Sequence, residues 1–367
     1  MVIGHKIYSI KCLDQQGYVC FMNQIETNSI LRRLSRYARL LAMTGVLLIV
    51  GLLVLIQQGG AQHHEKNTEE RQEAKSEVKV KSEVPGIADN FEIPAFADTD
   101  EGRLAEYGHR LITETYALIG PDTKKGISGN RLACSSCHLN AGTKAYAAPY
   151  VGLSAVFPIY IGRENKVESL EERINGCLER SMNGRTIDVN SEEMRGMITY
   201  IKHLSKNVAV GTRLKGQGFV AFKAPDRAAN PKKGALVYQK HCVSCHAVDG
   251  QGVRGAAGNR EGGFVFPPLW GNDSYNDGAG MARVLTAAKF IKGNMPLGVT
   301  HDNPTLSDEE AYDVAAYINS QSRPVKDGKE NDYPNLAKKP KDCAYPPYVD
   351  NISQQQHKYG PFNFAKK

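Results

Sequence analysis

Apolar side chains recur at helical spacing in four segments of the chain after residue 90. In the first of these, Leu104, Tyr107 and Leu111 begin a series that continues to Ile119 and predicts a helix over Arg103–Ile119. The other three segments begin at helix-start signals, namely Ser191-Glu-Glu-Met, Pro231 (which opens Pro231–His241) and the capping box Ser307-Asp-Glu-Glu310. Runs of β-branched residues are scarce between them. The pattern therefore predicts a mostly helical protein with long loops.

A different pattern occupies the N-terminal region. The run Leu40–Ile56 contains no charged residue, and four arginines lie between residues 32 and 39. This arrangement predicts a transmembrane anchor or signal sequence over 40–56, with the segment 1–39 in the cytoplasm and the rest of the chain in the periplasm. The length favours an uncleaved anchor in the inner membrane, although Gly59-Gly60-Ala61 could be a cleavage site. Met22 is a possible true start.

Two polar segments flank the helical part of the chain. Residues 57–89 are rich in Glu, Lys and Gln, which predicts a disordered charged tether. Residues 326–367 form a C-terminal tail with several prolines, which we expect to run over the surface. The net charge of +7 comes without a Lys/Arg array that includes aromatic residues, so nucleic acid is not an expected partner.

The chain contains two Cys-x-x-Cys-His motifs, the attachment signal for haem c. A zinc site would require further ligand pairs, and a redox dithiol usually opens a helix in a βαβ pattern; neither context is present. We therefore predict two covalently attached haem c groups, with the motif histidines as proximal iron ligands. The motif residues are Cys134, Cys137 and His138, followed by Cys242, Cys245 and His246.

Each motif is preceded by one predicted helix and followed, after a long loop, by another. This is the plan of a class I cytochrome c domain. The fold class predicted is mostly α, with two tandem domains of this kind, each around its haem. Residues 90–225 would form the domain with the active-site haem and residues 226–325 the domain with the electron-transfer haem. The boundary falls in the Gly-, Lys- and Pro-rich stretch 210–230.

The loop before the last helix of such a domain usually supplies the sixth iron ligand. In the second domain Met295 precedes Pro296 at a suitable distance before Tyr317. Its thioether would favour Fe(II) and raise the potential. Met281 is the alternative ligand, and simple core packing is the alternative role for Met295.

The first domain has a cysteine at the equivalent place, because Cys177 lies at nearly the same distance before Tyr200. A thiolate ligand would stabilise Fe(III) and lower the potential. Spacing alone leaves other roles open, including a buried apolar contact or a disulfide with Cys343. Other candidate ligands for the first haem are Met182, His203 and His109.

The segment Arg173-Ile-Asn-Gly-Cys177-Leu-Glu-Arg-Ser181-Met-Asn-Gly-Arg185 resembles the signature of the thiosulfate dehydrogenase and tetrathionate reductase family of dihaem c-type cytochromes. Tyr160-Ile-Gly-Arg163, Phe266-Pro-Pro-Leu-Trp270 and Asn294-Met295-Pro296-Leu297 also look like that family. The resemblance covers roughly residues 90–325. These periplasmic enzymes interconvert thiosulfate and tetrathionate.

The resemblance implies a role for each candidate site residue. His138 and Cys177 would ligate the first haem iron, and His246 and Met295 the second. The substrate would bind at the first haem, where Cys177, Arg163, Arg173 and Ser181 would be catalytic. Some members of the family have a lysine before the methionine as an alternative ligand; this chain has Asn294 there, so no such exchange is expected.

The charges agree with an anionic substrate. Thiosulfate is a dianion, and arginine offers fixed, bidentate contacts to oxyanions that offset the repulsion between two of them. Four arginines lie near Cys177 in sequence: Arg163, Arg173, Arg180 and Arg185. The electrons would pass to a redox partner such as a cytochrome c or a quinol-linked membrane enzyme.

Three other functions are compatible with two haem motifs. A non-catalytic electron carrier would need neither the cysteine nor the arginines. A dihaem subunit of a sulfur-oxidising complex would need a carrier protein to hold its substrate. A dihaem peroxidase would need an open iron site, which two predicted sixth ligands disfavour.

Overall fold

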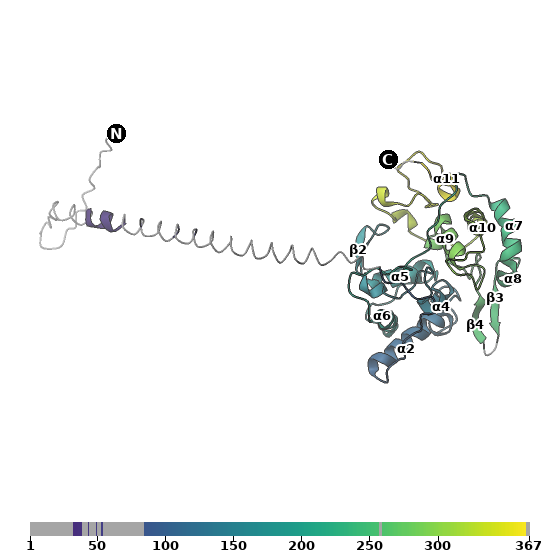
Figure 1. Cartoon of the computed structure of the whole chain (residues 1–367), viewed down its shortest axis with the longest axis horizontal. Helices are drawn as coiled ribbons and strands as arrows, with labels where there is room; N and C mark the ends of the chain where they lie inside the picture. Colours follow the sequence, from purple (N-terminus) through teal and green to yellow (C-terminus); the bar gives the residue numbers. More distant parts are fainter. Residues whose placement is uncertain are drawn as a thin grey trace, which may run out of the picture. The chain divides into compact units, whose positions relative to one another are not determined.

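The computed structural model describes residues 32–38, 43, 49, 53, 84–256 and 259–364 (Figure 1). The chain forms two units, Met1–Glu83 and Val84–Lys367. The predicted membrane segment 40–56 and the tether up to residue 83 lie almost entirely outside the described residues. In the part of the chain that is described, no helix is long and apolar enough to cross a membrane.

The second unit is mostly helical, as the sequence pattern predicts. We call residues 84–230 the first half, 231–325 the second half and 326–364 the C-terminal segment. The helices of the first half are α2 (Asp100–Thr113), α3 (Thr115–Leu118), η1 (Cys134–Ser136), α4 (Leu139–Gly142), η2 (Leu153–Ala155), α5 (Leu170–Arg180) and α6 (Glu192–Leu204). Those of the second half are α7 (Pro231–His241), α8 (Val243–His246), η3 (Gly280–Ala282), α9 (Val284–Asn294) and α10 (Asp308–Ser320).

The described strands form two small antiparallel sheets, and each contains only two strands. In the first half β1 (Ile159–Ile161) pairs with β2 (Lys166–Glu168), and in the second half β3 (Val253–Ala256) pairs with β4 (Asn259–Phe266). Neither pair could form a core alone. The strands therefore serve as hairpins that extend from helical halves.

Each half contains a crossing of its first and last helices, and the two crossings have the same close approach. A Cβ on Gly108 of α2 would lie 1.9 Å from the carbonyl oxygen of Gly196 in α6. A Cβ on Gly234 of α7 would likewise lie 1.9 Å from the carbonyl oxygen of Asp313 in α10. Only glycine permits two helix backbones to approach this closely. The same crossing in each half confirms the predicted repeat of two cytochrome c domains.

The predicted helix Arg103–Ile119 is interrupted. The structure ends α2 at Thr113 and begins α3 at Thr115, with Glu114 outside helical geometry between them. The Thr115 hydroxyl donates to the carbonyl oxygen of Leu111 at 2.6 Å, and the Thr113 hydroxyl donates to that of His109 at 2.9 Å. Such hydroxyl-to-backbone bonds compete with the helix ladder and favour a break.

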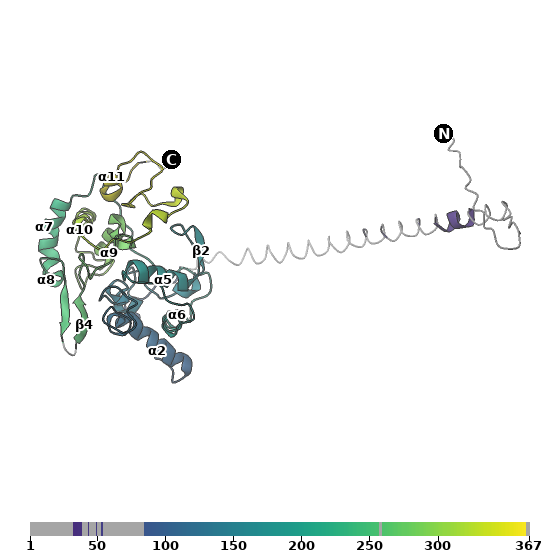
Figure 2. The ribbon, with the colours of Figure 1, turned by 180° about the vertical axis from the view of Figure 1, so that it is seen from behind.

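Each half has its own apolar core, and side chains of each half also reach the core of the other. Buried residues of α2, α5 and α6, together with residues of the intervening loops, form the first core, while α7, α9 and α10 supply most of the second. Phe264 of β4 is only 4% exposed and packs in the first core, although it belongs to the second half. In both Figure 1 and Figure 2 the β3–β4 hairpin extends from the α7–α8 end of the second half.

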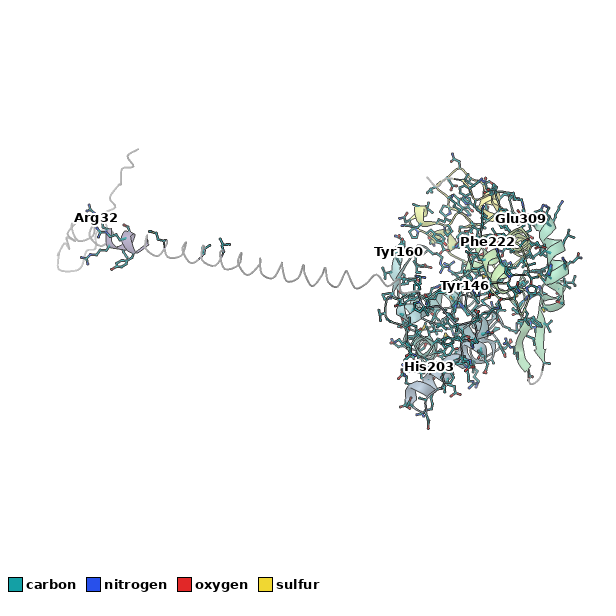
Figure 3. The ribbon with its side chains drawn as sticks, viewed as in Figure 1. Arg32, Tyr146, Tyr160, His203, Phe222 and Glu309 are labelled. Atoms are coloured by element: carbon teal, nitrogen blue, oxygen red, sulfur yellow. The ribbon has the colours of Figure 1, made fainter. Side chains whose placement is uncertain are left out.

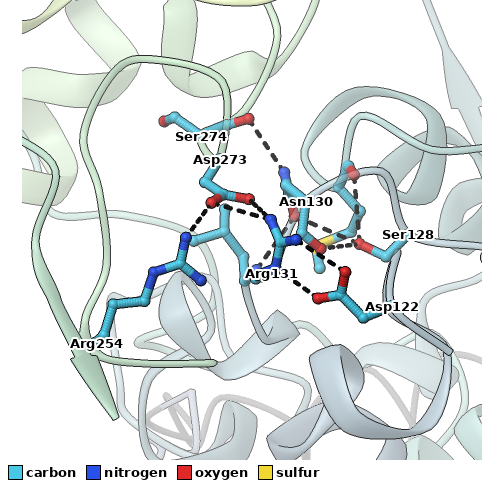
Figure 4. A network of polar contacts seen from close by, with 9 residues as sticks. Asp122, Ser128, Asn130, Arg131, Arg254, Asp273 and Ser274 are labelled. Carbon is cyan, nitrogen blue, oxygen red and sulfur yellow. Dashed lines mark hydrogen bonds and ion pairs between the residues drawn. The ribbon is translucent and has the colours of Figure 1, made fainter. Parts of the chain in front are cut away.

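A polar seam joins the same two halves (Figure 4). Arg131 pairs with Asp122 of its own half at 2.6 Å and with Asp273 of the second half at 3.1 Å. The Asn130 side chain donates to the carbonyl oxygens of Ser181 and Ser274, at 3.0 and 3.1 Å. Since Asn130 is fully buried, these bonds satisfy an amide that would otherwise be costly to bury.

The C-terminal segment is packed against the rest of the unit, which corrects our expectation of a surface tail. It contains η4 (Lys329–Asn331), η5 (Leu336–Lys338) and α11 (Gln354–Tyr359). Tyr333, Cys343 and Tyr345 are buried and form a small core of their own. Buried ion pairs that no local pattern reveals hold it in place, so the prolines did not prevent close packing.

The start of the unit is also ordered. The predicted tether extends to residue 89, but Ile87 is buried in the first core. Its backbone N–H donates to the carbonyl oxygen of Lys215 at 2.9 Å, and the Lys215 N–H donates to that of Pro85 at 3.0 Å. The packed part of the chain therefore begins at about Pro85.

We predict that Gly108→Ala and Gly234→Ala each lower the free energy of unfolding by about 1–3 kcal/mol, because the added methyl group overpacks the helix crossing. Gly280→Ala is the matched control, since nothing lies within 4 Å of its Cβ position, and it should change stability by less than about 0.5 kcal/mol. Chemical unfolding of the haem-loaded protein provides the measurement. Equal effects for all three variants would contradict the close-approach argument.

Candidate functional site

The first Cys-x-x-Cys-His motif lies in η1 and the residues that follow it. His138 is enclosed: its Nδ1–H donates to the carbonyl oxygen of Ala148 at 2.6 Å, and Tyr150 stacks on its ring at 4.5 Å. Burial lowers the pKa of His138 to about 4, which keeps the imidazole neutral. With Nδ1 engaged, Nε2 is left as the atom that can bind a metal.

The second motif has the same arrangement. The Nδ1–H of His246 donates to the carbonyl oxygen of Pro267 at 2.8 Å, and burial lowers the pKa of this histidine as well. None of the four motif cysteines, Cys134, Cys137, Cys242 and Cys245, is in a disulfide bond. Each motif thus offers two thiols and one correctly oriented neutral imidazole, and these donors fit a covalently attached haem c.

Helix α5 carries the central candidate residues. Its first turn is closed by a capping box, in which the Ser169 side chain accepts from the Glu172 N–H and Glu172 accepts from the Ser169 N–H. Leu170 and Leu178 are buried in the first core, with Ile174 packed against it, at the spacing of one helix face. This apolar face fixes how the helix is rotated about its axis.

The neighbouring face of α5 carries Arg173 and Cys177, and Ser181 follows one turn further on as the C-cap. Spacings of four residues place all three on one side of the helix. The structure therefore brings three of the four predicted catalytic residues together through local geometry alone.

Electrostatic interactions place this face at the first motif. Burial raises the pKa of Cys134 to about 11 and that of Cys137 to about 12, and the Cys177 thiol contributes to the rise in both. Arg173 contributes to the lowered pKa of His138, after burial. Cys177 and Arg173 thus share an enclosed environment with the haem-attachment residues.

Arg163 reaches the same helix from the turn between β1 and β2. A Cβ on Gly176 would lie 3.5 Å from one of its terminal nitrogens. Its Nε donates to Glu164 at 2.6 Å, and the side chain of Arg163 is 13% exposed. Within the described residues, neither the terminal nitrogens of Arg163 nor the guanidinium of Arg173 has a protein acceptor. Both arginines can therefore bind an anion from outside the chain.

The other two arginines of the sequence cluster are engaged in the fold. Arg180 forms a buried bidentate ion pair with Asp332, at 2.6 and 2.9 Å, and also donates to the carbonyl oxygen of Gly278 at 3.2 Å. Arg185 is exposed and donates to the carbonyl oxygen of Lys125 at 2.8 Å. The structure thus divides four arginines that are equivalent in sequence into two open ones and two occupied ones.

The structure gives less support to the other candidate ligands of the first haem and to a disulfide between Cys177 and Cys343. His203 bonds the carbonyl oxygen of Pro94 at 2.9 Å, and His109 lies against the rings of Phe96 and Tyr200. Met182 is buried in the first core. Cys177 and Cys343 are both free thiols, so the possible disulfide between them is absent from the structure.

The second half presents both methionine candidates. Met295 follows α9 directly, and Met295 and Met281 both pack, partly buried, against the second core. Asn294 is buried and donates to the carbonyl oxygen of Tyr146 at 3.1 Å. Figure 3 shows the labelled Tyr146 among the side chains of the second unit. The loop that carries Met295 is therefore fixed against the first half.

Sequence reasoning missed several residues that shape the site. Glu164 neutralises part of the Arg163 charge, and only its adjacency in sequence could have indicated this. Tyr150, which stacks on His138, and the buried Tyr275, whose pKa is raised by burial and to a smaller extent by Cys137, gave no local signal. Asp332 was also missed, because it is distant from Arg180 in sequence.

Comparisons with known proteins agree with this description. The family model for the SoxA/TsdA cytochrome c domain matches residues 123–210, and the cytochrome c model matches residues 231–322. A thiosulfate dehydrogenase from Psychrobacter arcticus is 39% identical over 240 residues, which cover 65% of this chain and 69% of the relative. One from Allochromatium vinosum is 40% identical over 250 residues, which cover 66% of this chain and 87% of the relative.

A solved structure gives a similar result. The thiosulfate dehydrogenase TsdBA from Marichromatium purpuratum, in its as-isolated form, is 36% identical with a TM-score of 0.58. The match covers 64% of this chain, and this chain spans 50% of the solved one.

We predict that Arg180 stabilises the fold and that Arg185 does not. Arg180→Met should lower the free energy of unfolding by about 3–5 kcal/mol, because it leaves the buried Asp332 carboxylate without its partner. Arg185→Met should change it by less than about 0.5 kcal/mol, since the side chain is exposed. Unfolding of the haem-loaded variants by denaturant compares them, and similar values for the two would contradict the division of the cluster.

Proposed function

The chain belongs to the thiosulfate dehydrogenase family of dihaem c-type cytochromes, and we propose that it catalyses the reversible oxidation of two thiosulfate ions to tetrathionate. One observation carries the proposal: Cys177 and the unpaired Arg173 share one face of α5 at the first haem motif. An electron carrier needs neither group. The two cytochrome c domains indicate two haem c groups, which would be attached through Cys134, Cys137, Cys242 and Cys245.

We propose that His138 and Cys177 ligate the iron of the first haem, and that His246 and Met295 ligate the iron of the second. The haems supply one-electron redox chemistry, and two of them match the two electrons released. A thiolate ligand lowers a haem potential and a thioether raises it. Electrons from oxidation would therefore leave by the second half.

The reaction brings two negatively charged substrate ions together, and the site has positive groups that can reduce their repulsion. Two thiosulfate dianions become one tetrathionate dianion when a bond forms between their outer sulfur atoms and two electrons are released. The approach of two dianions is opposed by repulsion. The open guanidinium groups of Arg163 and Arg173 would bind the sulfonate oxygens and offset that repulsion. The Ser181 hydroxyl, at the end of the same helix face, would add a hydrogen bond.

The proposal extends to the protein's surroundings. Haem c attachment in bacteria takes place in the periplasm, so we place residues 90–225 and 226–325, the two haem domains, in that compartment. The basic and apolar pattern up to Ile56 would anchor them to the inner membrane. The electron acceptor would be a cytochrome c or a quinol-linked membrane enzyme that contacts the second half.

We predict that Cys177→Ala retains both covalent haems but loses turnover in both directions. Attachment depends on the four motif cysteines, whereas oxidation of thiosulfate and reduction of tetrathionate share one transition state. Absorbance after denaturation measures the haem content, and steady-state assays with each substrate measure the activity. Cys343→Ala, which removes the free thiol of the C-terminal segment, should keep its turnover. Near-normal turnover by Cys177→Ala would contradict the proposed mechanism and favour the alternative function of a non-catalytic electron carrier.

The two open arginines generate a second prediction. Arg163→Ala and Arg173→Ala should each lower kcat/KM for thiosulfate by an amount equivalent to about 1.5–3 kcal/mol, the range for a hydrogen bond to a charged group. Arg185→Ala is the control and should be near wild type, because its side chain is exposed and bonds only a backbone carbonyl. If Arg185→Ala impaired the enzyme as strongly as the other two, the assignment of the anion site would be wrong.

A further inference from the structure

The C-terminal segment reaches the two ends of the candidate substrate site. The Asp332 carboxylate accepts hydrogen bonds from both terminal nitrogens of Arg180. Arg180 is the last residue of α5, directly before Ser181. The next residue, Tyr333, donates its backbone N–H to the carbonyl oxygen of Arg163 at 2.7 Å. Two consecutive residues of this segment thus hold the Cys177 helix and the strand turn that carries Arg163.

These contacts are enclosed and specific. The side chains of Arg180 and Asp332 are 10% and 9% exposed, so their ion pair is shielded from water. Burial opposes the charge on Arg163, but Glu164, Tyr333 and Asp332 outweigh this effect, and the pKa of Arg163 lies above its ordinary value. The segment therefore influences the position of Arg163 and stabilises its charged form.

Further contacts within the segment hold the Asp332 carboxylate and the chain around it. The Tyr345 hydroxyl donates to Oδ2 of Asp332 at 2.7 Å, an oxygen that also accepts from Arg180, and so gives the carboxylate a second fixed partner. Lys339 is buried and its ammonium lies 5.8, 4.9 and 5.1 Å from the centres of the Tyr333, Tyr345 and Tyr348 rings. Cation–π contacts of this kind, in a desolvated setting, stabilise a compact turn without regular secondary structure.

A separate ion pair ties the segment to the second half. Asp342 pairs with Arg283 and accepts the backbone N–H of Leu285 at 3.2 Å, at the start of α9. This anchor lies outside the first site. A variant that breaks this ion pair therefore serves as a control, because it should loosen the segment without touching the contacts to Arg180 and Arg163.

We propose that Asp332 and Tyr333 are positioning residues for the substrate site, which hold the open guanidinium of Arg163 against the Cys177 face of α5. The proposal rests on the proposed function, because the anion that Arg163 binds is taken to be thiosulfate. The segment lies outside both matched family models, which cover residues 123–210 and 231–322. It completes the site from a part of the chain far from Cys177 in sequence.

The test is Asp332→Asn, which keeps the shape of the side chain and removes its charge. We expect the KM for thiosulfate to rise about tenfold while kcat changes less than twofold, since the change weakens substrate binding without touching the reacting sulfur atoms. Amide hydrogen exchange of residues 159–168 should become faster, and the rise in Tm on addition of thiosulfate should shrink.

Asp342→Asn is the matched control, because it also removes the charge of a buried aspartate that pairs with arginine in the same segment. It should leave the exchange of residues 159–168 and the thiosulfate-dependent rise in Tm unchanged. Equal effects in the two variants would show that the segment stabilises the fold in general, and would overturn the proposal. So would an unchanged KM and unchanged exchange in Asp332→Asn.

Tyr345→Phe provides a milder change if Asp332→Asn does not fold. It removes only the hydroxyl that fixes Asp332, and should raise the KM by about two- to threefold with faster exchange in residues 159–168. No change in either quantity would overturn the proposal. A wild-type protein that neither turns over thiosulfate nor gains stability from it would instead reject the proposed function, while the exchange data would still decide whether the segment holds the Arg163 turn.

Discussion

The buried ion pair between Arg180 and Asp332 is the contact on which the arrangement of the first site depends. It joins the end of α5, the second half at Gly278 and the C-terminal segment. A pair of charges this enclosed is favourable only when its geometry and further hydrogen bonds offset desolvation. Here the Tyr345 hydroxyl and the Gly278 carbonyl oxygen complete it. The helix that carries Cys177 is consequently held by parts of the chain that follow it by many residues.

The two halves use one scaffold for two purposes. In both, a glycine lets the first helix cross the last one at backbone contact, and the histidine of the haem motif is oriented by a backbone carbonyl oxygen. The two halves differ in the candidate iron ligand and the charged residues that come before the last helix. The first half places Cys177 there beside arginines with free donors, whereas the second half places Met295 and the paired Lys292. A shared fold with different donors is a simple way to give two haems different properties.

Local sequence signals predicted much of this structure. The haem motifs, the capping box at Ser307 and the helix spacing act over a few residues, so they could be interpreted directly. The break at Glu114 escaped prediction because threonine hydroxyls competed with the helix ladder. Long-range partners decided the rest: only the structure separates Arg180, which Asp332 occupies, from Arg173, and only the structure packs the proline-rich C-terminal segment.

The central claim is that the two haems differ because Cys177 serves the first and Met295 the second. The most direct test is an equilibrium redox titration of the purified protein, followed by optical and electron paramagnetic resonance spectra. The account predicts two separate transitions, with the lower potential belonging to a haem that has thiolate character in its ferric spectrum. Two haems with alike potentials and histidine–methionine spectra would contradict it.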